Sequence, residues 1–123
     1  IVFAPYFVEY NAYVRNYDGN VVIISPDTET FMPKLDEFEA KITAKTKAVI
    51  INNPNNPTGR LIADDLLEEI LRICREKNIA LFVDECFLSL SDGGVDLTPS
   101  LSDFPQLFIL KAFTKRGCGW GTA

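Results

Sequence analysis

Side chains with three different chemistries each come shortly after an apolar run in this sequence. They are the amides of Asn55 and Asn56, the carboxylate of Asp84 and the amine of Lys115. A carboxylate directly after four apolar residues is costly to bury unless a cation pairs with it. A lysine just beyond a buried strand can be a desolvated, nucleophilic amine. The set indicates amine chemistry on a carbonyl carbon, beside a carboxylate that pairs with a cation.

Each side chain also has an interpretation without chemistry. Asn and Pro are ordinary turn residues, so residues 52–59 can be a loop that only leads into a helix. Asp84 can cap a helix or join a surface ion pair, and Lys115 can be a plain surface lysine. The choice depends on the elements that position these residues.

The spacing of apolar residues predicts strands that alternate with helices. The expected strands are residues 1–3, 21–24, 48–51, 79–83 and 107–110. The expected helices are residues 8–15, 34–44 and 62–77. We interpret residues 92–105, which contain Gly, Pro and Ser, as an exposed loop or one short helix. The alternation predicts an α/β fold with a mostly parallel sheet and no domain boundary.

The loop at residues 52–59 is tightly specified, because Pro54, Pro57 and Gly59 cannot lie inside a strand or a helix. It follows an apolar strand, as do Asp84 and the segment that leads to Lys115. In open α/β sheets, ligands bind at the edge where parallel strands have their carboxyl ends. We therefore expect the amide, the carboxylate and the amine to meet at that edge.

Composition and charge exclude several classes of protein. The 123 residues carry a net charge of −5, which argues against a nucleic-acid partner because phosphate binding needs a basic face. No apolar run approaches the ~18 residues of a membrane span, so we expect no membrane partner. Cys74, Cys86 and Cys118 form neither a disulfide framework nor a zinc motif, which favours a cytoplasmic protein with reduced thiols.

Histidine is absent, which excludes Ser-His-Asp and Cys-His catalysis and leaves no expected metal site. Any chemistry must then rest on Lys, Asp, Tyr or a cofactor. The chain is small for a complete enzyme and begins without methionine, so we expect a piece of a longer protein.

An amide, a carboxylate and a lysine at successive strand ends match what pyridoxal 5′-phosphate (PLP) requires of a protein. The lysine forms a Schiff base with the aldehyde of the cofactor. The carboxylate pairs with the pyridinium nitrogen and keeps it protonated, so that the ring acts as an electron sink. The amide donates a hydrogen bond to the phenolate oxygen.

Three motifs resemble the central segment of the class I/II aminotransferases, which are PLP enzymes of fold type I. They are Asn-Asn-Pro-Asn-Asn-Pro-Thr-Gly at residues 52–59, Val-Asp-Glu-Cys-Phe at residues 83–87 and Lys-Ala-Phe-Thr-Lys at residues 111–115. The separations of 28 residues from Asn56 to Asp84 and 31 residues from Asp84 to Lys115 also resemble that family. The resemblance reaches to about Lys115. It implies a three-layer α/β/α architecture in which residues 1–123 are part of the large PLP-binding domain.

The resemblance implies a cofactor role for five residues. Asn56 bonds the phenolate oxygen, and Asp84 pairs with the pyridinium nitrogen. Lys115 is the catalytic Schiff-base lysine, which later moves a proton as a general base. Phe7 stacks on the pyridine ring, although an apolar ring at this place can equally be plain core. Thr114 contacts the cofactor phosphate.

The sequence departs from the family pattern near its end. Phe87 stands where many members carry a tyrosine that bonds the phenolate oxygen. Ala112 replaces a Ser or Thr that binds the phosphate, and Ala123 stands where an arginine is usual. Residues 116–123 do not match the family sequence, so the 123 residues alone are expected to be inactive.

The resemblance implies an aminotransferase that moves an amino group between an amino acid and a 2-oxo acid and forms a homodimer. Residues 5–10 and 84–87 are similar to the histidinol-phosphate aminotransferase branch. Threonine-phosphate decarboxylases belong to that branch, so decarboxylation stays an alternative, as does an inactive fragment of either enzyme. A nucleotide-binding module is disfavoured, because neither a Gly-x-Gly-x-x-Gly nor a Walker loop follows a strand.

Overall fold

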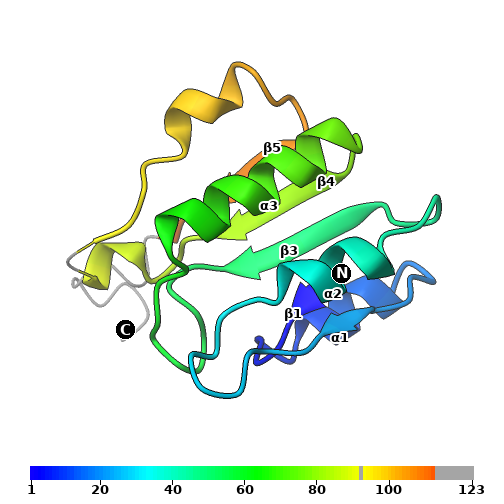
Figure 1. The fold of residues 1–123 in the computed structure, drawn as a ribbon, viewed down its shortest axis with the longest axis horizontal. Helices are drawn as coiled ribbons and strands as arrows, with labels where there is room; N and C mark the ends of the chain where they lie inside the picture. The colour runs from blue at the N-terminus through cyan, green and yellow to red at the C-terminus, as the bar shows by residue number, and fades with distance from the viewer. Residues whose placement is uncertain (92, 113–123) are drawn as a thin grey trace, which may run out of the picture.

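The computed structural model describes residues 1–91 and 93–112, and five parallel strands form one sheet in this part of the chain (Figure 1). The strands are β1 (Val2–Phe3), β2 (Ile23–Ile24), β3 (Ala48–Asn52), β4 (Ala80–Asp84) and β5 (Leu107–Leu110). Their order is β2-β1-β3-β4-β5, and each neighbouring pair is parallel. The prediction of an α/β fold with a mostly parallel sheet is confirmed.

Helices lie between the strands, as the sequence predicts. Within the two described ranges they are α1 (Tyr10–Arg15), α2 (Leu35–Lys41), α3 (Asp64–Glu76) and the 3-10 helices η1 (Leu88–Leu90) and η2 (Thr98–Leu101). The three predicted α-helices are each somewhat shorter than expected. The segment interpreted as a loop or one short helix contains η2.

The longest helix, α3, forms because its sequence meets several requirements at once. Asp64 and Asp65 lie in its first turn, where the helix dipole favours negative charge. Its apolar side chains recur at helical spacing and are buried against the sheet; they are Leu67, Ile70, Leu71, Ile73 and Cys74. Asn78 follows the helix with a φ of 55°, a left-handed conformation that asparagine tolerates and that ends helices.

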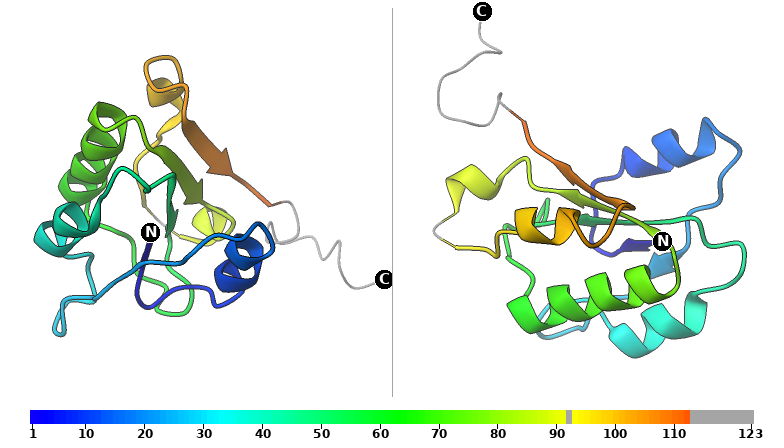
Figure 2. Two further views of the ribbon diagram at one scale, coloured as in Figure 1. Left: turned by 90° about the vertical axis from the view of Figure 1, so that its right-hand side faces the viewer. Right: turned by 90° about the horizontal axis from the view of Figure 1, so that it is seen from above.

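The sheet lies between helices. Figure 2 shows α2 and α3 on one face and α1 on the other. Alternate residues of the central strands point toward the α2–α3 face and are at most 2% exposed; they are Val49, Ile51, Leu81 and Val83. The opposite face is more open. There Phe82 stacks on Phe108 with ring centroids 4.7 Å apart, and Phe108 remains 44% exposed.

The strand register brings the carboxyl ends of the central strands to one edge. Asn52 of β3 pairs with Asp84 of β4, which pairs with Leu110 of β5. The chain that leaves β1 passes Pro5 and reaches α1 on the same side of the molecule, where Tyr10 contacts Asp84. Across the two described ranges, no helix is long and apolar enough to cross a membrane.

Candidate functional site

The loop after β3 is held against β4 by the side chain of Asn52. This residue is 5% exposed. Its Oδ1 accepts a hydrogen bond from the backbone N–H of Asn56 at 2.6 Å, and its Nδ2 donates to the carbonyl oxygen of Asp84 at 2.9 Å. One buried carboxamide therefore fixes the position of Asn56 relative to Asp84.

Two further asparagines also serve the loop itself. Asn53 Oδ1 accepts from the N–H of Ile62 at 2.8 Å, which anchors the approach to α3. Asn55 Nδ2 donates to the carbonyl of Pro5 at 2.8 Å, so the loop is tied to the segment after β1. Gly59 closes the turn with a φ of 71° and donates its N–H to the Asn55 carbonyl at 2.7 Å.

Asn56 differs from its three neighbours. Across residues 1–91 and 93–112, its carboxamide makes no hydrogen bond, and its backbone N–H is taken by Asn52. The residue lines a pocket of about 290 Å³ together with Pro57, Phe87 and Leu90. Of the four asparagines, Asn56 is thus the one whose amide can serve a ligand. This agrees with the predicted role of Asn56 toward the phenolate oxygen of the cofactor, and that role stays a prediction.

Asp84 ends β4 with two neutral donors on its carboxylate. Oδ2 accepts from the Tyr10 hydroxyl at 2.7 Å, and Oδ1 accepts from the N–H of Cys86 at 3.1 Å. Within the described part of the chain, no lysine or arginine pairs with Asp84. A carboxylate has about four acceptor positions, so positions remain for a cationic N–H donor from a ligand.

Glu85, the next residue after Asp84, has a carboxylate with a different environment. Glu85 follows β4 directly and has a different partner from Asp84. Its side chain is 4% exposed, and Oε2 lies 3.7 Å from Nζ of Lys111. Burial raises the pKa of Glu85, while the lysine partly opposes that shift. This pair joins the ends of β4 and β5.

Tyr10 is a residue of the site that the sequence reasoning missed. It is 5% exposed, and its ring meets the ring of Phe7 edge to face with centroids 5.6 Å apart. Burial, together with the hydrogen bond to Asp84, raises the pKa of the Tyr10 hydroxyl. A signal existed in the sequence: a buried tyrosine needs a partner for its hydroxyl, and Tyr10 follows Phe7 by one turn.

The predicted site residues fall into two groups. Phe7 and Asp84 come together through Tyr10, and Asn56 joins them through Asn52. Lys115 and Thr114 lie outside the described residues, so their predicted roles stay predictions.

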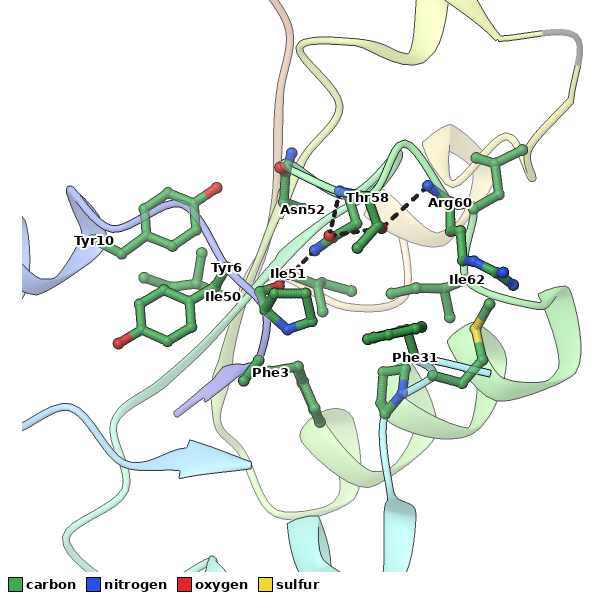
Figure 3. Close-up of a pocket in the computed structure, with 16 residues that line it drawn as sticks. Phe3, Tyr6, Tyr10, Phe31, Ile50, Ile51, Asn52, Thr58, Arg60 and Ile62 are labelled. Carbon is green, nitrogen blue, oxygen red and sulfur yellow. Dashed lines mark hydrogen bonds between the residues drawn. The ribbon is translucent and has the colours of Figure 1, made fainter. Parts of the chain in front are cut away.

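A small cavity is lined by Asn52 and Thr58 of the loop and also by Tyr10 (Figure 3). Tyr6 and Tyr10 lie on one side of it and Phe31 and Ile62 on the other. Its volume of about 20 Å³ has room for about one water molecule. The loop is therefore closely packed from below.

The residues at the edge fit a PLP ring. A carboxylate that is hydrogen-bonded, and that no cation of residues 1–91 or 93–112 pairs with, suits a pyridinium nitrogen. The Asn56 amide, which has no hydrogen bond to the described residues, suits a phenolate oxygen, and the Phe7 ring, which meets the ring of Tyr10, suits stacking. These are the groups that would hold the ring.

The Asn52 contacts lead to a stability prediction. Asn52→Ala is expected to lower the free energy of unfolding by about 2–3 kcal/mol, because the N–H of Asn56 and the carbonyl of Asp84 each lose a partner in a half-buried place. Urea unfolding of the purified protein measures the loss. Asn20→Ala, at an exposed asparagine, is the control and should change stability by about 0.5 kcal/mol or less. Equal losses in the two variants would contradict the anchoring role.

Known proteins resemble this chain over most of its length. A family model described as aminotransferase class I and II matches residues 1–117. Glutamate-pyruvate aminotransferase AlaA of Haemophilus influenzae is 40% identical over 98 residues, which cover 73% of this chain and 24% of that protein. Aspartate aminotransferase of Thermotoga maritima is 32% identical over 118 residues, which cover 94% of this chain and 31% of that protein. The chain spans about a quarter to a third of the length of these relatives.

Solved structures share the fold as well. Aspartate aminotransferase of Thermus thermophilus with maleate gives a TM-score of 0.82 at 31% identity, over 91% of this chain and 30% of that one. The Thermotoga maritima aspartate aminotransferase gives a TM-score of 0.81 at 30% identity, over 93% of this chain and 31% of that one.

Proposed function

The chain belongs to the aminotransferase class I and II family, and from this premise we propose that the whole protein transfers an amino group between an amino acid and a 2-oxo acid. The membership agrees with the family predicted from the three sequence motifs, and PLP is the cofactor of this family. The observation that carries the proposal is the edge of the sheet, where Asp84 and Asn56 keep hydrogen-bonding capacity for a ligand.

PLP, when bound, supplies an electron sink for the bonds of the substrate's Cα. The protein's part is to hold and orient. Asp84 places a negative charge at the edge of the sheet, Asn56 offers an amide beside the pocket, and Phe7 offers a ring face. Lys115 is the proposed amine that retains the cofactor covalently and carries a proton at Cα. Thr114 is the proposed phosphate contact.

Amino transfer is preferred over decarboxylation of a phosphorylated amino acid. The support is that the relatives named above are glutamate-pyruvate and aspartate aminotransferases. The histidinol-phosphate branch suggested by residues 5–10 and 84–87 stays a prediction. Phe87 and Ala112 depart from the family pattern. The alternative that the 123 residues alone have no activity therefore stays open.

We also propose the domain to which the chain belongs, the oligomeric state of the whole protein and its location in the cell. Residues 1–123 belong to the large PLP-binding domain of the whole protein, which forms a homodimer. We place the protein in the cytoplasm, and the buried free thiol of Cys74 supports this placement.

Trapping the cofactor tests the proposal. The whole protein is incubated with PLP, reduced with borohydride and digested, and mass spectrometry of the peptides is expected to find the pyridoxyl group on Lys115. The unreduced protein is then given candidate amino acids, and 2-oxo acid is expected without carbon dioxide. An adduct at another residue overturns the role of Lys115. Carbon dioxide without 2-oxo acid overturns amino transfer in favour of decarboxylation.

A further inference from the structure

We propose that Tyr10 is a positioning residue that fixes two protein groups toward the cofactor ring at once, the Asp84 carboxylate and the Phe7 ring. The inference rests on the proposed function and adds a residue to it. In this role Tyr10 acts through its two neighbours, Asp84 and Phe7.

The first contact joins distant parts of the chain. The Tyr10 hydroxyl donates to Asp84 Oδ2 at 2.7 Å across 74 residues of sequence. Tyr10 begins α1, on one face of the sheet, and Asp84 ends β4. The N–H of Cys86 holds the other carboxylate oxygen, so both oxygens of Asp84 have a fixed donor. These two hydrogen bonds fix the orientation of the Asp84 carboxylate. The acceptor positions that they leave unused therefore have a fixed orientation as well.

The hydroxyl is a neutral donor at neutral pH. Burial and the neighbouring carboxylate hold the pKa of Tyr10 above that of a free tyrosine. Tyr10 therefore orients Asp84 without neutralising its charge and without adding a second negative charge. A lysine or arginine at this place would pair with Asp84 and compete with a pyridinium N–H.

The second contact reaches Phe7. The two rings meet at 83° with centroids 5.6 Å apart, an edge-to-face arrangement. Tyr10 is 5% exposed, so its ring cannot move without repacking its surroundings. One rigid side chain thus sets the direction of the carboxylate and supports the edge of the ring beside it.

The same helix provides a matched control. Tyr13 also donates its hydroxyl to a carboxylate, Glu9 Oε2 at 3.1 Å, but it is 55% exposed and lies on the outer surface. Tyr13→Phe removes the same atom from a contact with a different carboxylate, and it keeps the ring whose centroid lies 6.5 Å from that of Tyr10. A difference in ligand binding between Tyr10→Phe and Tyr13→Phe is then due to the contact with Asp84. It is not a general effect of losing a tyrosine hydroxyl.

The test uses two ligands on the whole protein. One is PLP, and the other is its 1-deaza analogue, in which a carbon replaces the pyridine nitrogen. Equilibrium titration by absorbance gives the dissociation constant of each ligand for wild type, Tyr10→Phe and Tyr13→Phe. Tyr10→Phe is expected to weaken PLP binding about tenfold and to change binding of the deaza analogue by about twofold or less, because that analogue cannot pair with Asp84. Tyr13→Phe is expected to leave both constants within about twofold.

A double-variant cycle adds a second measurement. In an Asp84→Asn background, Tyr10→Phe should no longer weaken PLP binding by tenfold, because the negative charge that Tyr10 orients is already absent. Equal loss of both ligands, an unfolded Tyr10→Phe protein, or unchanged PLP binding each overturn the inference and leave the proposed function standing. Wild-type protein that binds no PLP overturns the proposed function, and the inference with it.

Discussion

Asp84→Asn is expected to lower the turnover number of the whole protein by about 10²–10³-fold while the fold stays intact. The substitution keeps the size of the side chain and an oxygen that can accept from the Tyr10 hydroxyl or the Cys86 N–H. It removes the negative charge. Without that charge, nothing in the described part of the site favours a protonated pyridine nitrogen, on which the electron sink depends.

Two measurements separate chemistry from folding. Initial rates with a saturating amino acid give the turnover number, and urea unfolding gives the stability, which is expected to change by about 1 kcal/mol or less. Asp27→Asn is the control, because Asp27 Oδ1 also accepts backbone hydrogen bonds, from Glu29 at 3.0 Å and Thr30 at 2.8 Å, in an exposed turn. That variant should keep its turnover number. A wild-type rate for Asp84→Asn would remove Asp84 from the mechanism.

The sequence predicted the edge of the sheet well because simple periodicities determine it. Strands that alternate with helices must run parallel, and parallel strands bring their carboxyl ends together. The pattern therefore places the ends of β3 and β4 at one edge, and the structure adds the register of Asn52 with Asp84. The helix at residues 62–77 was predicted to within two residues of α3, because its acidic first turn and apolar stripe agree.

What the sequence could not supply are contacts between distant residues. Nothing in residues 52–59 distinguishes Asn52 from Asn56, since both are asparagines in the same loop, and only the tertiary partners separate anchor from candidate ligand. The hydrogen bond from Tyr10 to Asp84 spans 74 residues and has no local signature.

Strand ends show the same limit. Residues 21–24 were predicted as one strand, but only Ile23 and Ile24 form β2, because β1 offers just Val2 and Phe3 as partners. β-branched residues favour an extended backbone. The number of residues that pair in a strand depends on the length of the adjacent strand.

Phe38→Ala is expected to lower the free energy of unfolding by about 3–5 kcal/mol. Phe38 is 0% exposed, and its ring packs on Phe3 of β1 with centroids 5.2 Å apart. The helix that carries it, α2, lies wholly in the described part of the chain and buries this one residue. Its N-terminal cap makes no side-chain hydrogen bond. Phe38 is therefore the buried apolar anchor of α2, beside the hydrogen bond from Lys41 Nζ to the Ile23 carbonyl at 2.7 Å, and its removal leaves a cavity in the core.

Phe108→Ala is the matched control, since it deletes the same atoms from the open face of the sheet. Phe108 stacks on Phe82 at 4.7 Å but is 44% exposed, so the expected loss is about 1 kcal/mol. Urea unfolding at 25 °C, with the same slope in both variants, compares the two losses. A loss of 3–5 kcal/mol is a large share of the ~5–15 kcal/mol that stabilises a typical domain. Equal losses for Phe38→Ala and Phe108→Ala would mean that α2 is held by contacts other than the Phe38 ring.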